Sequence, residues 1–254
     1  MLTDQKAREM QFQEEKYRRQ VPSLGDRFRK AVYAVTSAQY QAYSASVFPR
    51  CRNARVLEIG CGDGDDALKM VQNGANVSAI DISKAAIDMA NQLCIQRGLK
   101  ADFRVMDAEA LDFADSEFDL VCGEGVLHHL NLEIMVQQFR RILKPDGVAV
   151  FTEPLLGLNP VLRTFRWLTP TMRSPDEHPL VKSDLDLLRQ NFEQVDIQFF
   201  YVVTPLAALL YPLNWHKPVM RALDKFEQGF LFRRVPPMRK LAWSVCLNMI
   251  SPKK

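Results

Sequence analysis

Short apolar runs and longer helical patterns alternate along most of this chain. The predicted strands are the apolar runs at 55–59, 76–80, 101–105, 118–122, 147–152 and 194–203, with a last strand near 241–250. The predicted helices between them lie at 64–73, 83–97, 131–143, 183–191 and near 218–229. This alternation is typical of right-handed βαβ units on a parallel sheet. We therefore expect one α/β domain over residues 51–254.

Two further segments flank or interrupt this alternation. Residues 1–50 predict two helices, at 4–20 and 26–47, because charged residues and good helix formers give way to apolar positions at helical spacing. Residues 154–181 contain five prolines and show no regular period. We expect an N-terminal helical extension and an insertion on the sheet's carboxyl edge, where loops determine specificity in open α/β folds.

The first predicted strand runs directly into a turn with three glycines, Gly60, Gly62 and Gly64. Glycine has no Cβ and tolerates positive φ, so a ligand can lie against bare backbone there. A dinucleotide fingerprint would need glycine at position 65, which is Asp65. Glu58, two residues before the turn, would repel a pyrophosphate and attract an ammonium group. The turn therefore favours a nucleotide that carries a cationic amino acid.

The second predicted strand ends at Asp81, 21 residues after Gly60. An acid at this sequence separation from the glycine turn can accept hydrogen bonds from both ribose hydroxyls. Capping of the next helix is the alternative role for Asp81, but Ser83 already offers that cap. The third strand is followed by Asp107 and Ala108. Acids therefore follow two successive strand tips beyond the glycine turn.

The turn resembles motif I of the class I S-adenosylmethionine (SAM) dependent methyltransferases. The segments 118–130 and 141–147 resemble the small-molecule branch of that family, which includes quinone-biosynthesis enzymes, although Asp146 replaces a commoner glycine. The resemblance covers residues 55–153. It implies a Rossmann-like seven-stranded sheet with six parallel strands, a last antiparallel strand, and helices on both faces. Helices such as those in 1–50 often cover the cofactor in this family; packing on the sheet is the alternative.

The resemblance also implies where SAM would bind. The glycine loop would pass beneath the methionine part, with Glu58 near its amino group. Asp107 would accept a hydrogen bond from the adenine amine, and the Ala108 amide would donate to a ring nitrogen. The expected cofactor-binding residues are Glu58, Gly60, Cys61, Gly62, Gly64, Asp81, Ile82, Asp107, Ala108 and Glu124.

Histidines supply the candidate catalytic groups, because imidazole can act as a general base near neutral pH. His128 follows the fourth strand, and His178 lies in the Pro-bounded insertion beside Asp176 and Glu177. The alternative is that these residues only cap or pack local structure. Glu124, His128 and His129 lie on one short loop, without a clear further ligand from another segment, so we expect no metal.

Composition limits the possible substrates and the cellular location of the protein. The net charge of +3 divides into −3 over residues 1–153 and +6 over 154–254, a modest basic excess. With no Asn/Asp-Pro-Pro-Tyr segment after the fourth strand, this argues against a nucleic-acid substrate. The five cysteines show no metal or disulfide spacing, and the N-terminus lacks an apolar signal segment. We therefore expect a cytoplasmic protein with reduced thiols; its oligomeric state stays open.

The predicted function is SAM-dependent methylation of a small-molecule acceptor. The alternatives are a non-catalytic SAM-binding protein and, with less support, an NAD-linked oxidoreductase. The apolar stretches 199–213 and 230–232, next to Arg233 and Arg234, are best explained by core packing. Alternatively, they form an exposed surface for a membrane or a lipid-like acceptor.

Overall fold

The computed structural model describes residues 4–18, 37–156, 177–213 and 215–253. Seven strands form one sheet in the order β3-β2-β1-β4-β5-β7-β6. The strands are β1 (Arg55–Ile59), β2 (Asn76–Asp81), β3 (Asp102–Val105), β4 (Phe118–Glu124), β5 (Leu143–Pro154), β6 (Phe192–Phe200) and β7 (Ser244–Pro252). All seven were predicted from the sequence.

The expected strand directions are confirmed. The pairs β1–β2, β2–β3, β1–β4 and β4–β5 are parallel, whereas β7 runs antiparallel to both β5 and β6. Strand order reverses at β1, with β2 on one side and β4 on the other. In open α/β sheets, ligands bind outside the carboxyl ends of the strands at such a switch point. The glycine turn and Glu124 both lie there.

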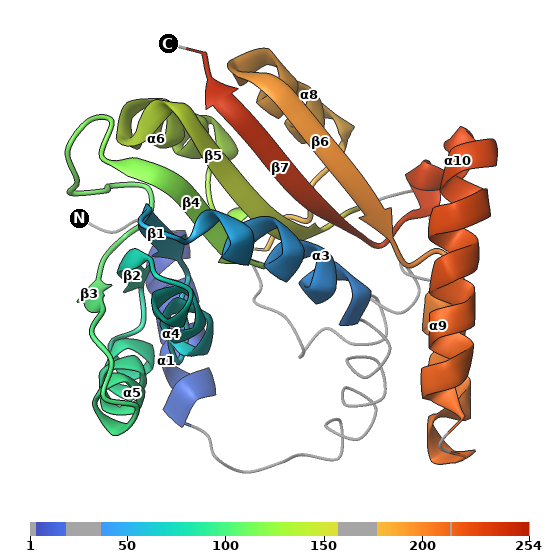
Figure 1. The fold of residues 1–254 in the computed structure, drawn as a ribbon, viewed down its shortest axis with the longest axis horizontal. Helices are drawn as coiled ribbons and strands as arrows, with labels where there is room; N and C mark the ends of the chain where they lie inside the picture. The colour runs from blue at the N-terminus through green and yellow to red at the C-terminus, as the bar shows by residue number, and fades with distance from the viewer. Residues whose placement is uncertain (1–3, 19–36, 157–176, 214, 254) are drawn as a thin grey trace.

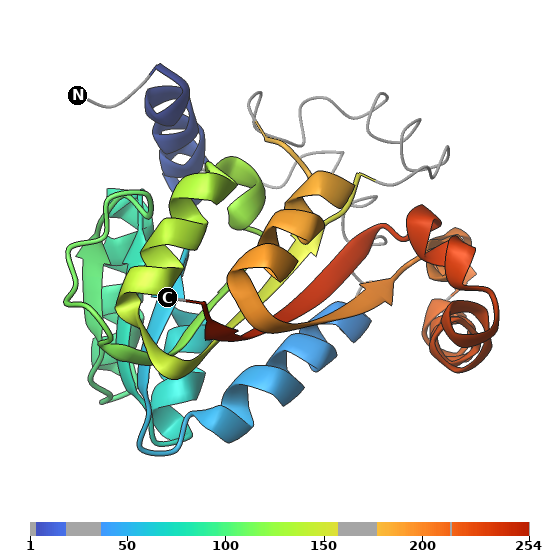
Figure 2. The ribbon, with the colours of Figure 1, turned by 90° about the horizontal axis from the view of Figure 1, so that it is seen from above.

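Helices cover both faces of the sheet (Figures 1 and 2). The main helices are α1 (Asp4–Arg18), α3 (Ser37–Val47), α4 (Asp65–Gln72), α5 (Lys84–Gln96), α6 (Leu132–Ile142), α8 (Lys182–Asn191), α9 (His216–Phe226) and α10 (Phe232–Arg234). Successive residues of β1 show why: Val56 packs with α3 and α4, whereas Leu57 packs in the core formed with α6 and α8. Strand side chains alternate between faces, so each face receives its own apolar row.

Strand β5 starts earlier than the sequence predicts. Gly147 was expected to open this strand after a turn, but Leu143 already pairs with Phe118, and the register shifts before Leu120 meets Val148. The irregular pairing lets the Lys144–Asp146 segment run with the strand despite Pro145. The preceding helix ends at Ile142 for the same reason, one residue before its predicted end.

The two N-terminal helices have different environments. Helix α3 packs against β5 and β7 and buries Tyr43 and Val47 in the core. Helix α1 instead contacts α5 near the carboxyl edge of the sheet. The predicted helix at 26–47 is seen from Ser37, and its earlier part lies outside the described residues.

Beyond β6 the chain forms an arm of short helices at the sheet's far edge (Figure 1). It consists of the 3₁₀ helix η4 (Thr204–Leu213), α9, the π-helical turn η5 (Glu227–Leu231), α10 and the 3₁₀ helix η6 (Pro236–Leu241). The predicted helix at 218–229 corresponds to α9 and the start of η5. None of the described helices is long and apolar enough to cross a membrane.

The buried carboxylate of Glu227 fastens this arm to the end of β6. Its two oxygens accept hydrogen bonds from the backbone N–H groups of Tyr201, Val202, Val203 and Thr204, at 2.5–3.1 Å. Tyr201 has a φ of +67°, so the chain turns sharply where these donors converge. One side chain therefore satisfies four backbone donors at this turn.

Candidate active site

The glycine turn has the conformation that its sequence predicts. Gly60, Gly62 and Gly64 all have positive φ, between +53° and +80°. A Cβ on Gly60 would lie 2.9 Å from a methyl of Val126, and one on Gly64 would lie 2.8 Å from Ala90. Gly60 and Gly62 line the hollows at the sheet edge, whereas Gly64 packs α4 against α5 and β3. The first two glycines therefore leave bare backbone facing a ligand.

Asp81 holds the turn from the tip of β2. Its Oδ2 accepts a hydrogen bond from the Gly62 amide at 3.0 Å, and its Oδ1 accepts one from the Ser83 amide at 2.8 Å. Ser83 is the helix cap, as predicted, because its Oγ accepts from the Ala86 amide. Each carboxylate oxygen has two lone pairs, so Asp81 can fix the turn and still accept from a diol.

Asp107 and Ala108 lie on the wall of the same pocket, at the end of β3. Lys6 of α1 pairs with Asp107 at 2.5 Å and with Glu109 at 2.8 Å. The Glu109 amide donates to the other Asp107 oxygen. The carboxylate predicted to meet adenine therefore already pairs with a cation from the N-terminal helix.

Helix α1 lies across this pocket. Lys6, Glu9, Gln13 and Tyr17 line it together with Gly60, Asp81, Ile82, Asp107, Ala108 and Glu124. Glu14 fastens the helix to the start of α5 by accepting hydrogen bonds from the Ser83 hydroxyl and the Ala85 amide. The cavity is about 160 Å³, below the ~300 Å³ of typical small-molecule sites. A larger ligand would require α1 to shift outward.

Buried acids lie beneath the glycine turn. Burial, reinforced by the Asp66 carboxylate, raises the pKa of Glu124 to about 7 and that of Glu58 well above its usual value. One oxygen of each acid is buried without a hydrogen-bond partner among the described residues. Cys61 lies beside them, and burial raises its thiol pKa too. Unpartnered acid oxygens in a buried hollow fit an ammonium group, which would supply the missing donors.

On the other side of the pocket, a short 3₁₀ turn, η2 (Leu127–His129), carries the two histidines. Glu153 of β5 accepts hydrogen bonds from the amides of Val126 and Leu127 and lies 2.7 Å from Nδ1 of His128. Glu177 lies 3.7 Å from Nε2 of the same ring. Burial lowers the pKa of His128, but the two carboxylates outweigh it and raise the pKa to about 9.

The comparisons with known proteins agree with this geometry. Residues 56–147 match a family described as a methyltransferase domain. The ubiquinone biosynthesis O-methyltransferase of Roseobacter denitrificans is 30% identical over 65% of this chain and 66% of its own length. The chain belongs to the class I SAM-dependent methyltransferases.

Two further similarities concern the sequence and the fold. The 27-O-demethylrifamycin SV methyltransferase of Amycolatopsis mediterranei is 33% identical over 46% of this chain and 44% of its own length. The fold is like that of a Haemonchus contortus N-methyltransferase solved with S-adenosylhomocysteine, with a TM-score of 0.59 at 14% identity over 85% of this chain and 53% of that one. The chain spans about two fifths of the length of other ubiquinone biosynthesis O-methyltransferases that it matches.

In this chain, the structure brings nine of the ten expected cofactor residues to the two adjoining hollows and places Gly64 in packing. His128 is buried near that edge, whereas the side chain of His178 is exposed and its backbone amide donates to the His128 carbonyl. Asp176 lies outside the described residues. Sequence reasoning missed the α1 residues that line the pocket. Their charged stretch shows no motif that would indicate a ligand-facing helix.

Proposed function

We propose that this chain transfers a methyl group from SAM to an oxygen of a small-molecule acceptor. The observation that carries the proposal is the series of acids at consecutive strand ends, Glu58, Asp81 and Asp107, around a glycine turn of positive φ. The two sequence relatives quoted above support an oxygen acceptor, because one is described as an O-methyltransferase and the other as a methyltransferase of an O-demethyl compound.

Each part of the site has a role in this proposal. Glu58 and Glu124 would hold the amino group, Asp81 the ribose diol, and Asp107 with the Ala108 amide the adenine edge. When bound, SAM supplies a methyl group whose C–S electrons move to sulfur as an acceptor lone pair forms the new bond. The pocket walls hold the acceptor in line and exclude water.

Helix α1 would act as a lid over this site. Lys6 contacts Asp107, and the Tyr17 hydroxyl lies where a Cβ on Gly62 would project, so the helix fills space that the cofactor would use. The segment 154–181 would form the acceptor wall; its described end is fastened to β5 by the Leu180 amide, which donates to the Pro154 carbonyl.

The catalytic roles predicted for His128 and His178 stay predictions. With a pKa of about 9, the His128 ring is positively charged near neutral pH, with both ring nitrogens protonated. It could act as a base toward the acceptor only after losing one of these protons, for example when Glu177 moves away. The exposed side chain of His178 would reach an acceptor only through a rearrangement of its loop.

The two alternatives predict different results in one assay. Purified protein is incubated with SAM carrying a labelled methyl group and an extract of small molecules, and labelled products are identified by mass. The proposal predicts a labelled product and stoichiometric S-adenosylhomocysteine. A non-catalytic SAM-binding protein would give neither across a broad acceptor panel, and an NAD-linked oxidoreductase would not consume SAM.

The pH dependence of SAM binding should follow Glu124. An ammonium favours the ionised carboxylate, so affinity should rise with pH until Glu124 ionises in the free protein, at about pH 7. Between pH 5.5 and 7 we expect the dissociation constant to fall roughly tenfold, while the ligand's α-amino group, with a pKa near ~7.8, stays charged. Calorimetry across this range should show a flat profile for Glu124→Gln; an unchanged slope in that variant would dismiss Glu124 as the titrating group.

We also propose that the arm contacts a membrane surface or an apolar acceptor. Part of the apolar content at the end of β6 and in the arm is core, as predicted, since Phe200, Leu231 and Phe232 are buried. Its exposed large apolar side chains among the described residues are Leu206, Leu213, Trp215, Phe226, Phe230 and Val235. Arg233 and Arg234 next to them suit anionic headgroups.

Co-sedimentation with liposomes tests the membrane contact. Anionic vesicles should pellet the protein, neutral vesicles should pellet less of it, and Trp215→Ser with Phe230→Ser should abolish the effect. Protein that stays in the supernatant with both lipids would contradict the proposal.

For the cellular location we infer the cytoplasm, because all five cysteines are free, buried thiols.

A further inference from the structure

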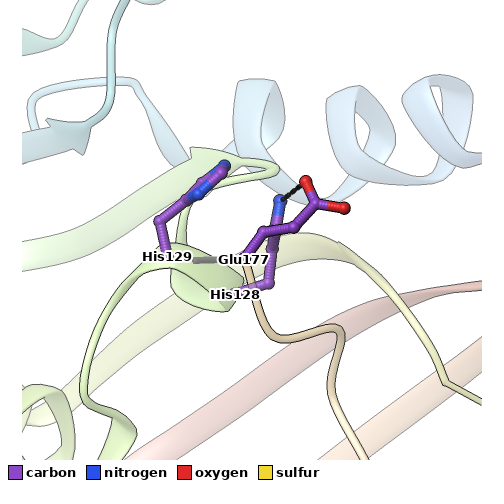
Figure 3. A group of neighbouring side chains, drawn as sticks. All are labelled: His128, His129 and Glu177. Atoms are coloured by element: carbon purple, nitrogen blue, oxygen red, sulfur yellow. Dashed lines mark ion pairs between the residues drawn. The ribbon is translucent and has the colours of Figure 1, made fainter. Parts of the chain in front are cut away.

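Figure 3 shows two histidines and one acid close together, and His129 among them lines the cofactor pocket. His128 and His129 come from η2, and Glu177 comes from the described end of the insertion. One ligating atom from each side chain lies within 4.8 Å of the others. In the sequence, the two histidines lack a clear ligand from another segment. The fold supplies that ligand, Glu177, from a segment about fifty residues further along the chain.

Backbone contacts hold Glu177 in this position. The His178 amide donates to the His128 carbonyl at 2.7 Å, which places the residue before it against η2. Two residues further on, Leu180 and Leu155 form a bridge beside the end of β5. Glu177 is therefore fixed near the histidines by main-chain hydrogen bonds and not only by its ion pair with His128.

The ring of His128 is held in the orientation that a metal ligand requires. The Glu153 carboxylate is fully buried and lies 2.7 Å from Nδ1, so this nitrogen carries the proton that it donates to Glu153. That arrangement turns Nε2 toward Glu177, 3.7 Å away. A carboxylate that orients a ligating histidine through its other nitrogen is a recurrent feature of metal sites.

His129 brings a second imidazole ring to the cluster. Its ring centroid lies 4.0 Å from that of His128, and its side chain is 14% exposed. The buried Nδ1 has no hydrogen-bond partner among the described residues, although an oxygen of Glu9 comes within 3.4 Å. Glu9 therefore approaches this nitrogen as an ion-pair partner, and the hydrogen-bonding capacity of Nδ1 stays unused among the described residues.

We propose that His128, His129 and Glu177 bind one divalent transition-metal ion of the zinc type. Imidazole nitrogens with one carboxylate oxygen suit Zn²⁺, Co²⁺ or Fe²⁺ rather than Ca²⁺ or Mg²⁺, which prefer oxygen ligands alone. Three protein ligands leave at least one coordination position open. Bond lengths of about 2.0–2.1 Å imply ligand separations near 3.3 Å, so Glu177 must close toward the rings by rotating its side chain.

The open position would face the acceptor. His129 lines the cofactor pocket together with Gly125, Val126 and Leu130, so an ion on its ring lies at the pocket's wall. This part of the inference rests on the proposed function: an acceptor hydroxyl on the metal would lose its proton more readily and face the methyl donor as an oxyanion. Metal binding itself does not depend on that chemistry.

Titration of metal-free, untagged full-length protein with Co²⁺ or Zn²⁺ alone tests the site. Calorimetry should show one ion per chain, cobalt should give a visible absorption spectrum of a nitrogen-ligated ion, and the metal should raise the melting temperature. His129→Ala and Glu177→Gln should each weaken binding at least tenfold. His178→Ala, in the adjacent exposed histidine, and His216→Ala, in a buried histidine of α9, are matched controls that should bind as the unaltered protein does.

The outcomes separate this inference from the proposed function. Absence of saturable one-to-one binding, or binding that survives both ligand substitutions, would overturn the metal site even if methyl transfer occurs. One-to-one binding that is lost in His129→Ala and Glu177→Gln would support it even if no acceptor is found, because no SAM is present in the titration.

Discussion

Gly62→Val is expected to weaken SAM binding more than roughly 100-fold, which is about 2.7 kcal/mol or more of binding free energy. Gly62 has a φ of +53°, and a Cβ there would project toward the hollow where the Tyr17 hydroxyl now lies. A valine side chain would occupy the ligand's volume. It would also strain the amide that donates to Asp81. Calorimetry with SAM measures the loss.

Gly98→Val is the matched control for backbone strain. Gly98 has a similar φ of +61°, and a Cβ there would meet no atom within 4 Å. Both variants should lose about 1–2 kcal/mol of folding free energy from the left-handed backbone, or roughly 2–8 °C in melting temperature. Only Gly62→Val should lose SAM. Equal SAM affinity in the two variants would show that the turn is not the cofactor's cradle.

Glu227→Ala is expected to destabilise the fold by at least about 3 kcal/mol. The substitution leaves four backbone N–H groups at the end of β6 without their acceptor, and each lost buried partner costs ~1–3 kcal/mol. At ~2–4 °C per kcal/mol, the melting temperature should fall by roughly 6–12 °C or more. Thermal unfolding followed by circular dichroism measures this fall.

Asp224→Asn is the control in the same arm. Burial, reinforced by the Glu227 carboxylate, raises the pKa of Asp224, and one of its oxygens is buried without a partner among the described residues. Replacing it removes no acceptor from a backbone donor, so stability should change by less than about 0.5 kcal/mol. A loss as large as that of Glu227→Ala would mean that the arm tolerates no change, and the capping role would fail.

The sheet and the positions of the candidate cofactor residues could be predicted because their determinants are local. A buried strand, a glycine turn and an acid at the next strand tip occur within short stretches, as with Gly60 and Asp81. Parallel strands bring their carboxyl ends to one edge, so separate motifs meet without knowledge of the loops. The strand periodicity likewise placed Val56 and Leu57 on opposite faces.

The remaining features depend on contacts between distant segments. Lys6 reaches Asp107 across 101 positions, and no local pattern says which face of a charged helix will meet which strand. Glu177 approaches η2 only because the chain beyond β5 folds back to it. Glu227 gave no signal, since a helical glutamate is ordinarily solvated and its four donors come from a segment more than twenty residues away.

Titration calorimetry of the purified protein with SAM and with NAD⁺ tests the central claim most directly, because the glycine turn and Asp81 could serve either ligand while Glu58 and Asp107 fit only the first. The account predicts one SAM bound per chain, displacement by S-adenosylhomocysteine, and no heat from NAD⁺. One-to-one binding of NAD⁺ without binding of SAM would contradict it.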